Sequence, residues 1–293
     1  MPSTISKNKP LPSWQFEAIG THWSIETPLV LSDELKNAIT KRIDEFDAAY
    51  SRFRDGSIVD KVAHIAGTYT FPNDSVDLIQ LYEKLYEATD GAVTPLVGDA
   101  LTTLGYDKNY SLKAERPATV KDWQSVMHWA GTTLITEQPV TLDFGAAGKG
   151  YLVDIIAKIL ESSGIDTYVI DASGDIRHRG VAQTVGLEDP HDQSRVIGVV
   201  ELQNTSLCAS ASNRRKWGNG LHHVIDGRTG KPTDDVIATW VTADTTAVAD
   251  GLATALFFVD SDRLQLFGEF QFVRLHNDGH VEHSHDFVGQ LFV

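Results

Sequence analysis

Hydrophobic side chains recur at helical spacing in four stretches of the chain. The clearest begins at Ser32 and has one apolar face, made of Leu35, Ile39, Ile43, Phe46 and Tyr50. A second helix is expected from about 75 to 88, where a turn signal of Asp90 and Gly91 ends it. A third should follow a glycine-rich turn and stop at Gly164, and a fourth is expected near 245–258.

Alternating and β-branched runs predict strands between these helices. Residues 14–29 form a hairpin-like pair around Gly20, and residues 270–287 form a pair joined at Asn277, Asp278 and Gly279. Two further runs, 167–180 and 196–210, also favour strands. Helices and strands do not alternate regularly, so an α+β fold is expected rather than a doubly wound α/β fold. Residues 1–13 are polar and contain prolines, which favours a flexible tail before one domain over 14–293.

Composition narrows the classes of function. The chain has 293 residues, 42% of them hydrophobic, and a formal net charge of −15, which argues against nucleic-acid or anionic-membrane binding. Cys208 is the only cysteine, which excludes an intramolecular disulfide and a cysteine metal cluster. No stretch is long and apolar enough for a signal peptide or a membrane span, so we expect a cytoplasmic protein without membrane insertion.

Several basic residues nevertheless lie close in sequence to the glycine-rich segments. They are Lys149, Arg214, Arg215, Lys216, Arg228 and Lys231. In an acidic chain such positive charge is consistent with an anion site, and scattered solvated side chains are the alternative.

The segment "LDFGAAGKGYLVD" (142–154) tests whether the chain has a P-loop. That motif needs a glycine six residues before its lysine and a hydroxyl residue directly after it. Counting from Lys149, these positions hold Asp143 and Gly150, so both tests fail. What remains is a strand-like start, a glycine-rich turn and a helix. The glycines allow the backbone to come close to a ligand, and the amino end of the helix favours an anion. A tight connection without a ligand is the alternative.

The segment "TAVADGLATALFF" places Asp250 and Thr254 on one face of a helix, among apolar neighbours. A carboxylate there needs a partner, and Mg²⁺ takes such hard oxygen ligands. The alternative is a helix-capping aspartate with a threonine bonded to its own helix.

Histidines occur in two segments of different character. In "LHHVIDGRTGKP", His222 and His223 precede a strand-like run and a turn, and a histidine near aspartate and arginine can act as a base or bind phosphate. The alternative is that His222 and His223 have structural rather than catalytic roles. His280, His283 and His285 lie in a polar hairpin, where we expect solvated side chains rather than a metal site.

Taken in order, these segments resemble the FAD:protein FMN transferase family, often called ApbE. The resemblance runs from about 19 to 259. Its aspartate, glycines and "KGY" match 143–151, its "NAGGD" matches "DASGD" at 171–175, its "HIIDPRTG" matches 223–230, and its "ADxxATA" matches 249–255. Upstream, "IGTHWS", "YSRFRDGS" and "TDGAVTPLVG" are similar to three more of its segments.

The resemblance implies a single α+β domain related to the T-fold, with FAD as substrate and Mg²⁺ as cofactor. It places FAD contacts at Ile19, Phe53, Ala92, Val93, Thr94, Asp143, Lys149 and Ile225. It places the metal ligands at the Ala146 carbonyl, the Asp250 carboxylate and the Thr254 hydroxyl. A threonine or serine of an acceptor flavoprotein would attack the flavin-side phosphorus, with His223 accepting the proton and AMP leaving. The metal would stabilise the phosphoryl charge.

The chain also departs from the family pattern. Ile19 replaces a methionine, Thr94 an aspartate and Asp171 an asparagine, while "CASA" at 208–211 replaces "ATSG" and Gly148 an alanine. The alternatives to transfer are a Mg²⁺-dependent FAD pyrophosphatase, which gives FMN and AMP, and a non-catalytic FAD-binding protein.

Overall fold

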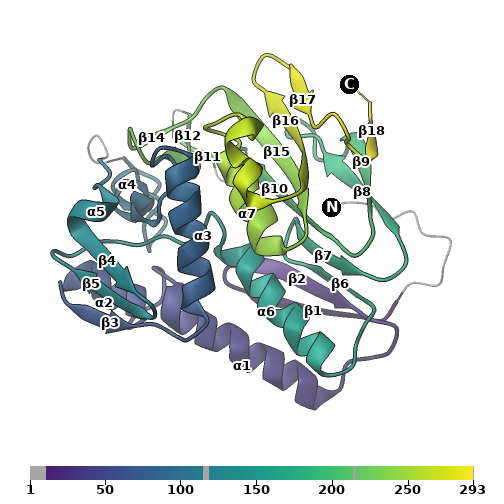
Figure 1. The fold of residues 1–293 in the computed structure, drawn as a ribbon, viewed down its shortest axis with the longest axis horizontal. Coiled ribbons are helices and arrows are strands. Elements are labelled where there is room, and N and C mark those ends of the chain that lie inside the picture. Colours follow the sequence, from purple (N-terminus) through teal and green to yellow (C-terminus); the bar gives the residue numbers. More distant parts are fainter. Residues whose placement is uncertain (1–10, 115–118, 214–215, 219, 293) are drawn as a thin grey trace.

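A computed structural model describes residues 11–114, 119–213, 216–218 and 220–292. Within these ranges, eight strands form one antiparallel sheet in the order β1-β2-β6-β7-β10-β15-β16-β17 (Figure 1). Their bounds are β1 Ser13–Ala18, β2 Thr21–Glu26, β6 Tyr168–Asp171, β7 Asp175–Arg179, β10 Ser206–Ala211, β15 Val236–Ala243, β16 Phe270–His276 and β17 Val281–His283.

The two faces of this sheet belong to different hydrophobic clusters. Along β10, Cys208 faces the cluster that holds the inner faces of α6 (Gly148–Ser162) and α7 (Thr246–Ala255). The next side chain back, Leu207, faces a second cluster with β8 (Gln183–Glu188) and β9 (Val196–Leu202). Those two strands and β18 (Gly289–Leu291) form a small sheet. The main sheet therefore lies between helices and a second sheet.

The remaining helices extend the helical layer away from the sheet (Figure 1). α1 (Asp33–Tyr50) packs on α6, and α3 (Ser75–Ala88) packs on α7. Beyond them lie α2 Ile58–His64, α4 Gly98–Thr103, α5 Trp123–Val126, the 3₁₀ turn η1 Pro95–Val97, and a sheet of β3 Thr68–Thr70, β5 Thr133–Thr136 and β4 Met127–Ala130. Shorter elements are β11 Lys216–Trp217, β12 Leu221–His222, β13 Ile225–Asp226, β14 Lys231–Pro232 and η2 Ser261–Phe267.

Side-chain caps fix where the principal helices begin. The Ser32 hydroxyl accepts a hydrogen bond from the Leu35 amide at 3.3 Å, which starts α1. At α7 the Thr245 hydroxyl caps the Val248 amide. The Asp154 carboxylate of α6 accepts the Thr246 and Ala247 amides at 2.9 and 2.8 Å. The start of α7 is therefore held by α6 as well as by its own cap.

Most of the predicted elements are confirmed, and the α+β class with them. The helices predicted at 32–50 and 75–88 are α1 and α3, and the two hairpins are β1–β2 and β16–β17. The strand-like start predicted for the 142–154 segment is wrong, because the residues before the turn are irregular and α6 begins only at Gly148. Ser13 belongs to β1, where it pairs with Glu26, rather than to the tail; residues 1–10 of that tail lie outside the described residues.

Gly150 of α6 lies directly against α7. A Cβ atom at this position would lie 2.3 Å from the Thr246 carbonyl oxygen and 2.8 Å from the Asp250 Cβ. Neither neighbour is a flexible side-chain end, so the two helices would have to separate. The third glycine of the turn therefore serves helix packing.

Gly150→Ala is expected to destabilise the protein by about 1–3 kcal/mol, the usual cost of overpacking a core. The thermal midpoint should fall by several degrees in a differential scanning calorimetry experiment. Gly148→Ala is the matched control, because the nearest atom to its added Cβ would be the Phe144 Cβ at 3.3 Å. A wild-type midpoint for Gly150→Ala would contradict this account of the helix contact.

Candidate functional site

The glycine-rich turn is organised around Asp143. Its amide donates to the Pro95 carbonyl at 2.7 Å, which ties the turn to η1. One carboxylate oxygen accepts the Gly145 amide at 2.8 Å, and the other accepts Arg52 Nε at 2.6 Å. The carboxylate therefore shapes the turn from within and also holds a buried cation beside it.

Ala146, the next position of interest, is fixed at both of its backbone polar groups. Its amide donates to the Tyr82 hydroxyl at 3.1 Å. Its carbonyl oxygen accepts the Thr254 hydroxyl at 3.4 Å. The turn thereby brings together the carbonyl and hydroxyl oxygens that lie 108 positions apart in the chain.

A buried group of charges lies beside these oxygens. Lys149 Nζ lies 2.7 Å from Asp175 Oδ2 and donates to the Ala172 carbonyl at 2.8 Å. Asp250 Oδ2 accepts the Gly150 amide at 2.9 Å, and Asp250 and Asp175 are only 5% and 1% exposed. α6, β7 and α7 each supply one charge to this group.

Burial and mutual repulsion shape the protonation of these carboxylates. Burial raises the pKa of Asp250 well above its usual range, and the nearby Asp175 carboxylate raises it further. Burial also raises the pKa of Asp175, against the lowering effect of Lys149. The same two carboxylates keep the pKa of the Lys149 ammonium high despite its burial. The group therefore carries more negative than positive charge when both carboxylates ionise.

The oxygen donors at this place fit a hard divalent cation. Asp250 offers a carboxylate, Thr254 a half-buried hydroxyl and Ala146 a carbonyl, which are ligands that Mg²⁺ takes. A cation would also relieve the repulsion that raises the pKa of Asp250. Across the described ranges, no three His, Cys, Asp or Glu side chains gather as metal ligands. Mg²⁺ is usually held by few protein carboxylates, while phosphate and water complete its coordination shell.

The positions that the resemblance assigned to FAD fall into two kinds. Ala92, Val93 and Thr94 have buried side chains. The Ala92 carbonyl accepts the Gly227 amide at 2.8 Å, and the Thr94 hydroxyl caps the Leu96 amide at 3.2 Å. These residues therefore support the wall of the site, and the side chains themselves present little surface to a ligand.

The other FAD positions line aromatic and turn surfaces. Phe53 and Ile225 belong to one hydrophobic cluster with Tyr106 and Trp217. Ile19 occupies the β1–β2 turn with a positive φ of 45°, which is uncommon for a β-branched residue. Such strain persists where the surrounding structure or a ligand requires it.

The two histidines of the 221–232 segment have different settings. His222 is buried, with Nε2 2.6 Å from the Thr233 carbonyl and Nδ1 accepting the Val224 amide. Burial lowers the pKa of His222, so it is neutral at pH 7. The residues from 221 to 226 do not form one continuous strand, because β12 ends at His222 and β13 begins at Ile225. His223 lies in the connection between them, half-buried.

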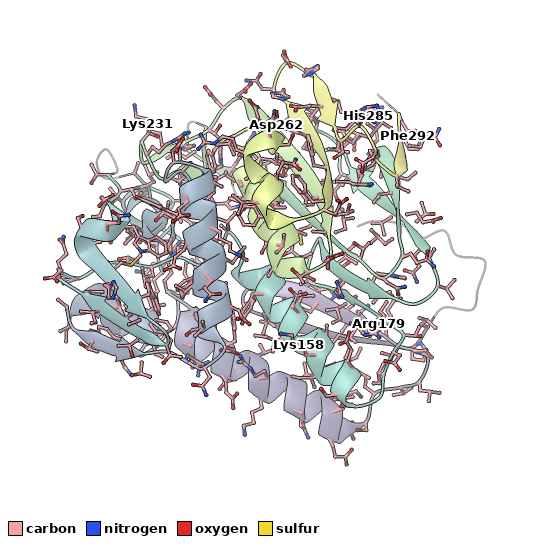
Figure 2. All side chains as sticks on the ribbon, in the orientation of Figure 1. Lys158, Arg179, Lys231, Asp262, His285 and Phe292 are labelled. Carbon is pink, nitrogen blue, oxygen red and sulfur yellow. The ribbon has the colours of Figure 1, made fainter. Side chains whose placement is uncertain are left out.

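Four of the six basic residues near the glycine-rich segments are described by the structure. Of these four, only Lys149 lies within the buried charge group. Lys216 and Lys231 are exposed, with Lys231 at the outer edge of the molecule (Figure 2), and Arg228 pairs with Asp226 at 2.7 Å. Arg214 and Arg215 lie outside the described residues. Among the described residues, the predicted basic cluster is therefore a single lysine, Lys149. Arg52, which the sequence did not suggest, is a second buried basic side chain at the site.

The remaining residues that the sequence singled out are three histidines near the C-terminus and Cys208. His280, His283 and His285 are exposed near the C-terminus, as expected for solvated side chains. Cys208 is fully buried, and burial raises the pKa of its thiol well above the usual value. No helix in the described ranges has the length and apolarity to cross a membrane.

Sequence reasoning missed three residues that organise the site. Arg52 directly precedes Phe53, so its position was a usable signal. Tyr82 sits on the apolar face of α3 and looks like an ordinary core residue. Gly227 stands where the family pattern has proline; its amide bonds Ala92, and a Cβ there would lie 2.4 Å from the Gly91 carbonyl.

Two proteins of similar sequence carry the same name. The FAD:protein FMN transferase of Klebsiella pneumoniae (strain 342) is 24% identical over 280 residues, which cover 85% of this chain and 79% of that protein. The FAD:protein FMN transferase of Vibrio cholerae is 26% identical over 254 residues, covering 79% and 75%.

Solved structures show the same fold. The ApbE protein of Thermotoga maritima superposes with a TM-score of 0.80 at 22% identity, covering 94% of this chain and 97% of that one. The flavin transferase ApbE of Vibrio cholerae superposes with a TM-score of 0.76 at 21% identity, with the same coverage. The sequence model of the ApbE family matches residues 19–272, which is most of the chain. This protein therefore belongs to the ApbE family.

Proposed function

We propose that this protein is a Mg²⁺-dependent FAD:protein FMN transferase. The observation that carries the proposal is the buried Asp250 carboxylate beside the paired Ala146 carbonyl and Thr254 hydroxyl, at the start of α6. Membership of the ApbE family and the names of the relatives support the same chemistry. The acceptor is a flavoprotein with a threonine or serine hydroxyl.

In this reaction the acceptor oxygen bonds to the flavin-side phosphorus of FAD, the bond to the AMP oxygen breaks, and the hydroxyl proton leaves to a base. A bound Mg²⁺ supplies positive charge to the phosphoryl oxygens. Asp250, Thr254 and Ala146 would hold that ion. Burial is the first cause of the raised pKa of Asp250, and the nearby Asp175 carboxylate adds to it, so a cation at this place would offset both effects.

The neighbouring groups orient the reactants. Lys149 is held between Asp175 and the Ala172 carbonyl, so its charge has a fixed position near Asp250. Asp143 keeps the turn in shape through the Gly145 amide. Rigid placement of this kind lowers the entropy cost of bringing the hydroxyl to phosphorus.

His223 is the proposed acceptor of the hydroxyl proton. It lies in the connection between β12 and β13, four residues before Gly227, whose amide bonds the Ala92 carbonyl. The ordinary pKa of a histidine suits proton transfer near neutral pH. Its neighbour His222 is held by Thr233 and Val224 and serves the structure.

One incubation distinguishes transfer from its alternatives. Purified protein, FAD and Mg²⁺ are mixed with and without a candidate acceptor, and AMP is quantified while the acceptor is weighed by mass spectrometry. AMP only with the acceptor, together with an added FMN mass, is the expected result. AMP without the acceptor identifies a pyrophosphatase, and FAD binding without AMP identifies a binding protein.

Asp250→Asn should lower FAD turnover by about 10²-fold or more, because it removes the charge that would hold the cation while keeping the side-chain shape. The rate of AMP release is measured across Mg²⁺ concentrations and in EDTA. Asp244→Asn is the matched control, since Asp244 is exposed just before α7. Wild-type turnover of Asp250→Asn in EDTA would overturn the metal assignment.

His223→Ala should slow single-turnover FMN transfer by about 10²–10⁴-fold and leave the FAD dissociation constant nearly unchanged. Exposed His128→Ala is the matched control, expected to transfer at the wild-type rate. His222→Ala is unsuitable as a silent control, because it should lower the thermal midpoint by removing the contacts to Thr233 and Val224. Unchanged transfer by His223→Ala, or loss of FAD binding with it, would refute the base assignment.

A further inference from the structure

Arg52 has a buried nitrogen with no hydrogen-bond partner. Its side chain is 4% exposed, and Nε is engaged by Asp143 Oδ2 at 2.6 Å. Nη2 is enclosed by protein, and no described group accepts a hydrogen bond from it. An unmet donor on a buried cation is costly, so such a group suggests an acceptor brought by a ligand.

The surroundings of this guanidinium are flat and aromatic. It lies over the Phe53 ring at 4.1 Å and near the Tyr106 ring at 5.1 Å. Phe53 is parallel to Tyr110, with a centroid distance of 5.6 Å and an interplanar angle of 7°, and Tyr106 stacks on Trp217. Two ring pairs of this cluster therefore pack face to face, as a planar heterocycle would pack on them, while Tyr106 meets Phe53 and Tyr110 edge-on.

We propose that Arg52 Nη2 donates a hydrogen bond to a carbonyl oxygen of the flavin ring of FAD. The inference rests on the proposed function, since it assumes FAD as the ligand. The flavin ring carries two carbonyl oxygens and adenine carries none, so a charged donor between aromatic faces fits the flavin better. The phosphates are accounted for elsewhere, at Asp250, Thr254 and Ala146.

The contact to Asp143 explains only part of the side chain. Holding that carboxylate occupies Nε, and a lysine could supply the same charge at one point. The planar fork of arginine fixes further nitrogens at defined angles, and one of them, Nη2, is buried without a partner. Arg52 is therefore a binding residue that selects the flavin half of the dinucleotide.

The test compares Arg52→Lys with Arg54→Lys by isothermal titration with FAD, FMN and ADP. Arg54 lies two positions away and pairs with Asp44 and Asp47 on α1, so its variant should bind all three like the wild type. Arg52→Lys should bind FAD and FMN about 10- to 100-fold more weakly, the effect of losing a hydrogen bond from a charged group. Its ADP affinity should stay within about twofold, which also shows that the site is folded.

A second measurement uses the wild-type protein and so does not depend on the folding of a variant. FAD analogues with sulfur in place of a ring carbonyl oxygen are weaker acceptors, and one of them should bind less tightly than FAD. The visible absorption band of bound FAD should also differ between wild type and Arg52→Lys.

The outcomes separate the inference from the function beneath it. A loss of ADP affinity equal to that of FAD would place Arg52 at the adenine or phosphate end and overturn the proposal. Unchanged FAD and FMN affinities, with an unchanged absorption band and equal binding of both sulfur analogues, would leave Arg52 with the Asp143 contact alone and also overturn it. No FAD binding by the wild type would reject the proposed function itself.

Discussion

The constraint on which the site depends is the burial of two carboxylates with one lysine. Lys149 pairs with Asp175 and also attracts Asp250 electrostatically, and burial raises the pKa of both carboxyl groups. Buried charge is stable only where it is paired or bonded, and this group is paired incompletely by the residues that the structure describes. This imbalance is the physical argument behind the cation that we propose at Asp250.

The fold concentrates these charges because three elements meet beneath one turn. α6 supplies Lys149, β7 supplies Asp175 and α7 supplies Asp250. The meeting requires α6 and α7 to approach closely, which the absence of a side chain at Gly150 permits. The same glycine donates its amide to Asp250, so helix packing and carboxylate orientation depend on a single position.

The sequence predicted what local periodicity encodes. α1 and α3 were predicted almost residue by residue, because their apolar faces and end signals lie within each segment. It did not reveal β15, whose nearly continuous burial gives no alternation, nor the roles of Arg52 and Tyr82, whose partners Asp143 and Ala146 are 91 and 64 positions away. The strand-like start expected for the 142–154 segment is not a strand for a related reason. Asp143 holds this part of the chain through distant contacts, with its amide on the Pro95 carbonyl and its carboxylate on Arg52, so no strand partner is needed.

Asp143 connects the two halves of the proposed ligand site. One carboxylate oxygen holds the Gly145 amide, and with it the turn that positions Ala146. The other holds Arg52, and with it the aromatic cluster around Phe53. A ring bound at Arg52 and a pyrophosphate bound near Asp250 would therefore be set in register by one carboxylate. Because its two oxygens serve different ends of the site, asparagine, with one acceptor and one donor, could maintain only one of these contacts.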